Sequence, residues 1–278
     1  MTPQAKHALG RLAFATRLDA VLLRAAVVVA FHRVDDGSDP SGLSISRDMF
    51  ERHCRFFKRH FDVVPLRDVV ASLEKGAPVE GRLAITFDDG YRDNFVNARP
   101  VLEALALPAT FFVVSRWIGS DAWPWWDRQR NARHPWMSWS QVRVLNERGF
   151  DIGAHTRTHA DLGRVFGPDA RHEIAGARHD IEQRIGRRVD LFAYPYGRLD
   201  NISDANRALV KAAGFRCCCS CYGGVTRGTA DPFRLQRVAV TPWYHSPHHF
   251  GAALLREAGA TPHEKGRACS EVSAAIGF

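Results

Sequence analysis

The chain has 278 residues, of which 45% are hydrophobic and 24% charged, an ordinary composition for a globular protein. This length suits one large α/β domain or two small ones, and it can bury a sizeable core. The net charge is +8 and the sequence pI about 9.5, yet the basic residues are spread along the chain without a dense tract or an RNA-binding signature. Composition therefore argues against a nucleic-acid-binding protein.

The N-terminal segment carries no secretory signal, because basic residues interrupt each of its apolar runs. No stretch in it approaches the length of a membrane span. From Ala5 to Arg24 leucines alternate with basic residues, which fits a helix packed on the protein's own core. The alternative is an amphipathic helix on a membrane surface. We expect residues 1–25 to form a helical extension, with peripheral membrane association through it as the alternative.

From Ala26 onward, short apolar runs alternate with amphipathic segments. Continuous or β-branched apolar runs predict strands over residues 26–31, 61–64, 83–87, 109–114, 150–154, 190–194, 215–220 and 233–240. Periodic segments with capping residues predict helices over residues 47–60, 66–73, 95–105, 140–148, 169–185 and 201–213. This alternation predicts parallel β/α units in a single α/β domain over residues 26–258. The pattern leaves a closed barrel and an open sheet undecided, and residues 259–278 are expected to form a loosely ordered tail.

A tryptophan-rich segment, residues 115–138, interrupts the alternation. Five of the chain's tryptophans fall in it, together with prolines and arginines. A loop this long inside a compact domain is usually functional, and this one is too aromatic to be disordered. It is either a sugar-binding wall or a satellite hydrophobic cluster.

Four of the six cysteines crowd into residues 217–221, too closely for a disulfide framework. Their spacing matches no common zinc pattern. We expect a buried strand that uses cysteine as a small apolar residue, in a protein from a reducing compartment. Without a secretory signal, the expected location is the cytoplasm, with membrane association as an open addition.

Two adjacent carboxylates, Asp88 and Asp89, follow the strand at residues 83–87, and Gly90 then allows a sharp turn. By itself this stretch could be a surface turn, because Asp-Gly is a common turn dipeptide. However, His32 and His155 also follow apolar strands, and catalytic residues of a β/α barrel lie where strands end and loops begin. Polar residues that recur at the ends of several strands are hard to explain by a purely structural role.

His155 and His159 are separated by three residues, so their imidazoles can converge on one metal ion. Two imidazoles and one carboxylate form a ligand set that leaves positions open for water. One aspartate of the pair can complete this set, and the other is then available as a base. A bound cation would also remove the repulsion between the two carboxylates.

Three segments carry a resemblance to a known family: TFDDG at residues 86–90, HTRTH at 155–159 and AYPYG at 193–197. In this order they resemble the motifs of the polysaccharide deacetylases, carbohydrate esterase family 4. The resemblance implies a distorted (β/α) barrel of about seven strands and metal-dependent removal of N-acetyl groups from amino sugars by an activated water.

The family pattern also assigns roles to individual residues. Asp88 resembles the general base and Asp89 the metal-binding carboxylate, while His155 and His159 resemble the histidine ligands. The backbone N–H of Tyr196 would help to hold the oxyanion. The expected cofactor is a divalent ion, Zn²⁺ in the first place, with Co²⁺ or Mn²⁺ as alternatives.

The chain departs from the commonest family pattern in two places. Ala193 stands where an arginine is usual, and the late strand offers Arg237 instead of the expected acid histidine. His32 ends the first strand, which resembles a circularly permuted branch that includes poly-N-acetylglucosamine deacetylases. We therefore expect His32, rather than a late histidine, to be the general acid, and Arg237 to replace the missing arginine beside Asp88.

The expected function is N-deacetylation of a polysaccharide or glycan precursor. A deformylase or deacetylase acting on a lipid-linked sugar is one alternative. A non-catalytic carbohydrate-binding protein on the same scaffold is another. The sequence does not identify the glycan, the metal or the oligomeric state.

Overall fold

The computed structural model describes residues 1–16, 23–37, 39 and 41–259. Apart from Gly259, the expected C-terminal tail therefore lies outside the described residues, as do residues 17–22 of the expected N-terminal extension. Within the described part of the chain, no helix is long and apolar enough to cross a membrane.

The core of the molecule is a parallel sheet in the spatial order β10-β1-β5-β6-β7-β8-β9, with β4 added beside the start of β5. Its strands are β1 (Val27–Phe31), β4 (Asp62–Val63), β5 (Arg82–Phe87), β6 (Thr110–Val113), β7 (Asp151–Ala154), β8 (Leu191–Ala193), β9 (Cys217–Cys219) and β10 (Val238–Ala239). All five residues of β1 are buried, as expected for a strand covered on both faces. A small parallel pair, β2 (Arg33–Val34) and β3 (Ser44–Ile45), follows β1.

The two edges of the sheet meet through the segment that leads into β10. Leu235 bridges to Cys219 of β9, while Val238 pairs with Val29 of β1. The sheet therefore closes into a barrel, but its last wall is an irregular segment with only two residues in β10. The expected distorted (β/α) barrel in a single domain is confirmed, and closure decides between the two arrangements that the sequence left open.

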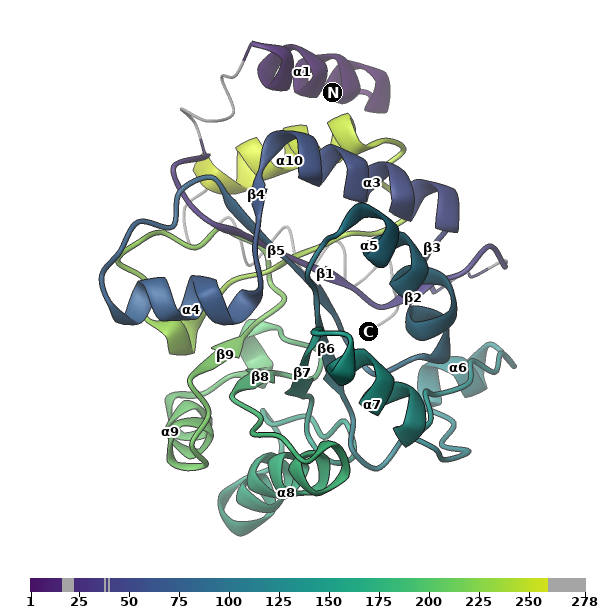
Figure 1. Ribbon diagram of the computed structural model, residues 1–278, viewed down its shortest axis with the longest axis vertical. Coiled ribbons are helices and arrows are strands. Elements are labelled where there is room, and N and C mark those ends of the chain that lie inside the picture. The colour runs from purple at the N-terminus through teal and green to yellow at the C-terminus, as the bar shows by residue number, and fades with distance from the viewer. Residues whose placement is uncertain (17–22, 38, 40, 260–278) are drawn as a thin grey trace.

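Helices cover the outside of the barrel (Figure 1). They are α3 (Arg47–His60), α4 (Leu66–Glu74), α5 (Arg99–Leu105), α6 (Trp125–Gln129), α7 (Trp139–Glu147), α8 (Gly167–Ile185), α9 (Asp204–Ala212) and α10 (Pro247–Gly259). Helix α3 begins where the sequence predicts, because Ser46 accepts a hydrogen bond from the Met49 N–H at 3.3 Å. Its apolar face is buried against the barrel through Phe50, Cys54 and Phe57.

Several predicted boundaries shift, each for a local reason. Helix α7 begins after Ser138 rather than Ser140, because Ser138 and Gln141 form a reciprocal capping box. Helix α9 begins only after Ser203, since residues 199–201 form a separate 3₁₀ turn, η2 (Leu199–Asn201). A short π-helix, η1 (Asn94–Ala98), precedes α5. The strand predicted over 233–240 is shorter, because η3 (Pro232–Arg234) occupies its start.

The cysteine strand agrees with the prediction. Cys217, Cys218 and Cys219 form β9 and are buried, and they carry free thiols. Cys217 and Cys219 pack with Leu191, Ala193 and neighbouring apolar residues. They serve as small apolar side chains in the barrel wall.

The N-terminal helix α1 (Pro3–Ala15) lies at one end of the molecule, above α10 and α3 (Figure 1). Gly10 allows the close approach, because a Cβ at this position would lie 1.9 Å from the His248 carbonyl oxygen. Phe14 packs against Phe56 and is buried. The helix is thus docked on the body of the protein, as the core-packing interpretation expects.

Candidate active site

Asp88, Asp89 and Gly90 form the turn at the carboxyl end of β5. Asp89 has φ +73° and Gly90 φ +92°, so the chain reverses over two left-handed residues. Aspartate tolerates this conformation better than most side chains do. A Cβ at position 90 would lie 2.6 Å from Ile118, which restricts that position to glycine. This strained turn lets two consecutive carboxylates face one site, although neighbours on a strand point in opposite directions.

Asp89, His155 and His159 converge at the strand ends of β5 and β7. Their ligand atoms lie within 4.8 Å of one another, and all three residues are buried. Asp89 Oδ1 lies 3.4 Å from His155 Nε2 and 3.3 Å from His159 Nε2. Burial raises the pKa of Asp89, but the two imidazoles outweigh it and hold this pKa well below its ordinary value.

The donor set fits a divalent cation. Asp89 Oδ1 is buried and has no hydrogen-bond partner among the described residues. A buried carboxylate oxygen requires a hydrogen-bond donor or a cation, and a bound metal ion would supply the cation. His155 Nδ1 lies 2.8 Å from the Ala193 carbonyl oxygen, and donation to it leaves the Nε2 lone pair pointing at Asp89. A second hydrogen bond of this kind is what orients imidazoles that bind metals.

Asp88 is held by a buried arginine from the far side of the barrel. Arg237 donates from Nη1 to Oδ1 and from Nη2 to Oδ2 of Asp88, both at 2.7 Å. It also donates to the Ser220 carbonyl oxygen and to Thr86 Oγ1. Burial raises the pKa of Asp88, but the charge and hydrogen bonds of Arg237, together with the nearby imidazoles of His155 and His32, outweigh it, so the net shift is downward. The predicted neighbourhood of Arg237 and Asp88 is therefore present, and Asp88 is an oriented, ionised carboxylate.

His32 follows β1 and interacts electrostatically with Asp88, Asp89 and His155. Its backbone carbonyl oxygen accepts a hydrogen bond from Asn94 Nδ2 at 2.8 Å. Burial lowers the pKa of His32, and Arg237 and His155 lower it further, while the two aspartates oppose them. The structure thus brings His32 to the same site as the aspartate pair.

Tyr196 lies in the turn after β8 and has φ +62°. The Gly197 N–H donates to the Pro195 carbonyl oxygen at 2.6 Å, which closes the turn. The ring of Tyr196 meets the ring of His159 edge to face, with centroids 4.8 Å apart. The Pro195-Tyr196-Gly197 turn is therefore adjacent to a ligand of the triad.

The late histidines lie elsewhere. His248 and His249 belong to α10, and the ring of His248 contacts those of His7 and Phe56. His245 pairs with His249. Among the described residues, the ring contacts of His245, His248 and His249 do not reach Asp89, His155 or His159.

The tryptophan-rich segment forms an aromatic wall beside His159. Trp117 stacks on the His159 ring at 5.1 Å and 20°, and Trp126 meets it at 5.1 Å from another side. Trp126 also donates from Nε1 to Tyr91 Oη, so its ring is fixed. These residues form a satellite cluster with Leu43 and Tyr196 at the site itself. The structure therefore shows the satellite hydrophobic cluster, and its position beside His159 is compatible with the sugar-binding wall, which stays a prediction.

One structural element of the site was not anticipated from the sequence. Arg33 is fully buried and pairs with Asp39 at 2.8 Å and with Asp127 of α6 at 3.2 Å. It also lies over the Tyr91 ring at 5.1 Å. Since Arg33 directly follows His32, it ties the tryptophan-rich segment to the end of β1. The only signal in the sequence is the charged residue that follows His32 at the end of an apolar strand.

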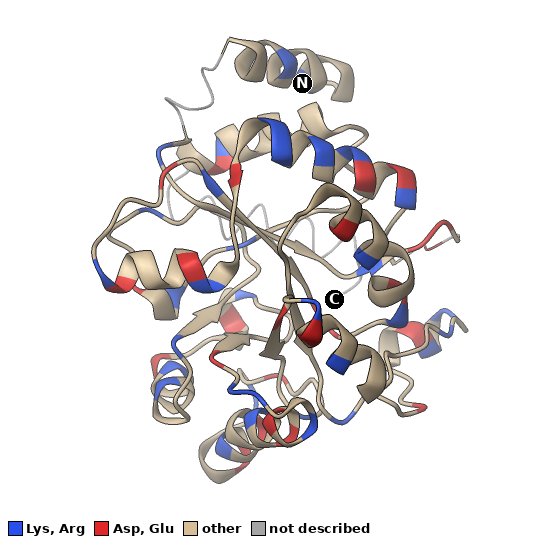
Figure 2. Ribbon diagram, in the orientation of Figure 1, with Lys and Arg blue, Asp and Glu red and all other residues tan. Residues whose placement is uncertain are grey.

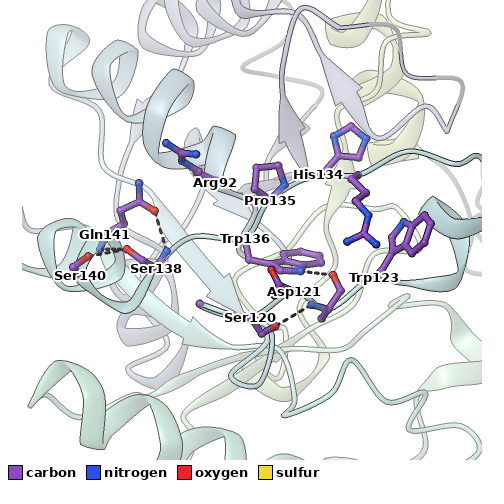
Figure 3. Close-up of a pocket in the computed structure, with 13 residues that line it drawn as sticks. Arg92, Ser120, Asp121, Trp123, His134, Pro135, Trp136, Ser138, Ser140 and Gln141 are labelled. Atoms are coloured by element: carbon purple, nitrogen blue, oxygen red, sulfur yellow. Dashed lines mark hydrogen bonds between the residues drawn. The ribbon is translucent and has the colours of Figure 1, made fainter.

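A polar hollow of about 630 Å³ is lined in part by the same tryptophan-rich segment (Figure 3). Its lining includes Arg92, Asp121, Trp123, His134, Trp136 and Gln141. Trp136 lies between the hollow and the site, because its ring stacks on Tyr91 and lies 4.7 Å from the ring of Trp117, which covers His159. The Trp123 and Trp136 indole N–H groups donate to the Ala132 and Ala122 carbonyl oxygens, so both rings are anchored.

Comparison with known proteins gives a consistent result. The family model described as polysaccharide deacetylase matches residues 75–218. YxkH of Bacillus subtilis, which carries the name of the same family, is 24% identical over 232 residues, covering 82% of this chain and 75% of YxkH. The poly-β-1,6-N-acetyl-D-glucosamine N-deacetylase of Escherichia coli K12 is 25% identical over 214 residues, covering 64% of this chain but 31% of that enzyme.

Among solved structures, IcaB from Ammonifex degensii superposes with a TM-score of 0.70 at 23% identity, covering 84% of this chain and 97% of that one. At this identity the superposition shows a common fold.

Proposed function

Because the chain belongs to the polysaccharide deacetylase family and is a hydrolase of carbon–nitrogen bonds, we propose that it removes N-acetyl groups from the amino sugars of a polysaccharide or glycan precursor. The observation that carries the proposal is the buried Asp89, His155 and His159 triad beside an ionised, arginine-held Asp88. An amide is a poor electrophile, so its hydrolysis needs an activated water, a stabilised oxyanion and a protonated leaving amine. The site contains a candidate for each task.

Asp88 would act as the general base. Its two oxygens are fixed by Arg237, and it is ionised at neutral pH, so it can accept the proton of the attacking water. The C–O bond forms as this proton leaves, and the C–N bond then breaks to release acetate and the free amine. Asp89, His155 and His159 would hold the divalent cation, which when bound polarises the carbonyl and lowers the pKa of water.

His32 and Tyr196 would complete the reaction. The Tyr196 N–H lies in a left-handed turn beside His159, where it can donate to the developing oxyanion. His32 shares the field of both aspartates and can give its proton to the leaving amine. The ion is proposed to be Zn²⁺, because two imidazoles and one carboxylate suit it, with Co²⁺ and Mn²⁺ as alternatives.

The substrate class follows from the wall of the site and from the relatives. Aromatic faces such as Trp117 and Trp126 suit the apolar faces of sugar rings. The named relatives include poly-β-1,6-N-acetylglucosamine N-deacetylases, so a β-1,6-linked N-acetylglucosamine oligomer is the first substrate to test. The hollow lined by Trp123 and Trp136 is proposed to receive a neighbouring sugar.

An acetate-release assay tests the function. The purified chain, stripped with a chelator and reloaded with Zn²⁺, Co²⁺ or Mn²⁺, is mixed with N-acetylglucosamine oligomers, sugar nucleotides and lipid-linked sugars. Metal-dependent acetate release from at least one of them is expected, and it should disappear in Asp88→Asn while the bound metal stays. If no member of the panel releases acetate with any of the three ions, the proposal is wrong.

Two alternatives have distinct outcomes in the same assay. Formate release from an N-formyl sugar without acetate release would identify a deformylase of a lipid-linked sugar. Saturable glycan binding without release of either acid would identify a carbohydrate-binding protein. The complete triad together with the oriented Asp88 favours catalysis over binding alone.

The place of action is proposed to be the cytosolic face of the cell envelope, since the cysteines of the described residues are free thiols, as in a reducing compartment. Peripheral membrane association through α1 is part of the same proposal, as is a division into an N-terminal extension and a catalytic domain. The circular permutation suggested by His32 also stays a prediction.

A further inference from the structure

A basic groove of about 670 Å³ lies between α1, α3 and α10, in a part of the molecule that the proposed chemistry does not use. Its charged and titratable lining comes from all three helices: Arg11, Arg52, Arg55, Arg59, His60 and His248. In Figure 2 the basic residues of α3 lie in the layer directly beneath α1. The groove therefore concentrates positive charge at the joint between the N-terminal helix and the barrel.

The positive charge of the groove is only partly compensated. Arg52 and Arg55 pair with Asp48 and Glu51 on the exposed surface of α3. Arg11 and Arg59 form no ion pair with any described residue, and both are exposed. Burial lowers the pKa of His248, and the charges of His7, His60, Arg11 and Arg59 lower it further. A concentration of like charges without matching carboxylates attracts anions.

The floor of the groove is aromatic and rigid. Phe14 of α1 meets Phe56 of α3 at 4.8 Å and His60 at 5.0 Å, and Phe56 in turn meets His248 of α10 at 5.3 Å. At the other end of α1, His7 Nδ1 lies 2.6 Å from Ser246 Oγ. Because α1 is fixed at both ends, the basic side chains are held around a preformed hollow.

The outward face of α1 is uncharged. Leu9 and Leu12 are 48% and 63% exposed, and Ala5, Ala8 and Ala15 share the same exposed side. No acidic residue occurs in α1. An exposed face of alanine and leucine flanked by basic residues, here Lys6 and Arg11, is typical of helices that lie in the interface of a membrane. The apolar face lies among the acyl chains and the basic flank at the headgroups.

We propose that α1 and the groove beneath it dock the protein on a membrane containing anionic phospholipids. Leu9 and Leu12 enter the interfacial region, and phosphate groups of the lipids occupy the groove between Arg11 and Arg59. The charge of the groove and the apolar face of the same helix favour a bilayer over a soluble anion, because a soluble anion would leave the leucines exposed. This site lies in residues outside the proposed catalytic groups, so it can fail or succeed independently of the deacetylase.

Vesicle sedimentation with the full chain tests the proposal. Large vesicles of phosphatidylcholine alone are compared with vesicles that also contain phosphatidylglycerol, at low and at high salt. The phosphatidylglycerol fraction is roughly three parts in ten, an anionic content that gives the vesicles a strong negative surface potential. Binding only to the anionic vesicles, weakened by salt, is expected. Each basic residue near such a surface changes the affinity about fivefold, so Arg11→Glu with Arg59→Glu should reduce binding by much more than tenfold.

A matched control separates a site from net charge. Arg171 and Arg187 are exposed residues of α8 and of the turn after it, and α8 lies at the opposite end of the molecule from α1 (Figure 1). Arg171→Glu with Arg187→Glu makes the same change in net charge and should leave vesicle binding nearly intact. Leu9→Ser with Leu12→Ser tests the apolar face and should also reduce binding. Melting temperatures by circular dichroism verify that every variant is folded.

Three results distinguish a membrane-docking site from its alternatives. If the α8 variant lost vesicle binding to the same extent, net charge alone would explain the effect, and the proposed docking site would be wrong. Binding of inorganic phosphate in a titration without any vesicle binding would overturn the membrane as occupant. Deacetylation of a soluble oligomer should be unchanged in Arg11→Glu with Arg59→Glu, so a failed proposed function and a failed docking site give different results.

Discussion

The carboxyl end of the barrel and the groove under α1 treat charge in opposite ways. At the barrel end both buried arginines are paired: Arg237 with Asp88, and Arg33 with Asp39 and Asp127. Under α1 the arginines are exposed, and Arg11 and Arg59 have no ion pair among the described residues. Buried charges require partners because desolvation is costly, whereas exposed charges are solvated and stay available to a large external anion. The buried pairs orient side chains for catalysis, whereas the exposed arginines can attract an anionic membrane surface.

The largest expected effect is that of Asp88→Asn on turnover. The carboxamide keeps the shape of the side chain but cannot accept the proton of water, so kcat should fall by about 100- to 10,000-fold. Rates on an N-acetylglucosamine oligomer measure this, with bound metal measured alongside. Wild-type turnover in this variant would contradict the role of Asp88 as base.

Arg237→Gln tests the buried side of the comparison directly. It leaves the Asp88 carboxylate buried without its cation, which should lower the free energy of unfolding by about 3–5 kcal/mol. Denaturant unfolding measures the loss. The matched surface change, Arg59→Gln, should alter stability by less than about 0.5 kcal/mol. Equal effects at the two positions would refute the contrast between the regions.

Asp93 gives a pH-dependent test near the same strand ends. Burial raises the pKa of Asp93 to about 7, although the hydrogen bond from the Val34 N–H and the charge of Arg33 both lower it. The folded state therefore holds this proton when the unfolded state has released it, and the stabilisation present below about pH 4 is lost as the pH rises through about 7.

Asp93→Asn should flatten this dependence and make the protein more stable than the wild type at pH 8. The amide oxygen can still accept the bonds from Val34 and Asn94. Melting temperatures from pH 4 to 8 measure it, with the exposed Asp62→Asn as control. A wild-type pH profile in Asp93→Asn would show that Asp93 does not titrate in this range.

The smallest expected effect belongs to the aromatic wall. Trp117→Leu removes the ring stacked on His159, an interaction worth about 1 kcal/mol, so KM for the glycan or the metal affinity should change only several-fold. Steady-state kinetics with a metal titration separates the two. The exposed Trp125, which is 41% accessible, provides a matched change with Trp125→Leu. An equally small effect of both substitutions on KM and metal affinity would leave the wall without a role in the site.

Local sequence was sufficient for most strands and for the residues that form the site. Strand and helix positions follow from periodicity and from caps such as Ser46, while the boundaries at Ser138 and Ser203 depended on which of several nearby polar residues completes a cap. The six predicted site residues gather at one end of the barrel because parallel strands place their carboxyl ends together. Their roles stay proposals to be tested as described.

The sequence by itself determined the β/α alternation, the aspartate pair with its glycine, and the two histidines with three residues between them, because each depends on contacts between near neighbours in the chain. Only the tertiary structure decided that the sheet closes through Leu235 and that Arg33 joins β2 to α6. The resemblance to the family placed Arg237 beside Asp88, and the tertiary structure added that both oxygens of Asp88 accept hydrogen bonds from it. These contacts link residues up to 149 positions apart. No local pattern specifies such a pair; it forms because folding brings buried charges together and each then requires a partner.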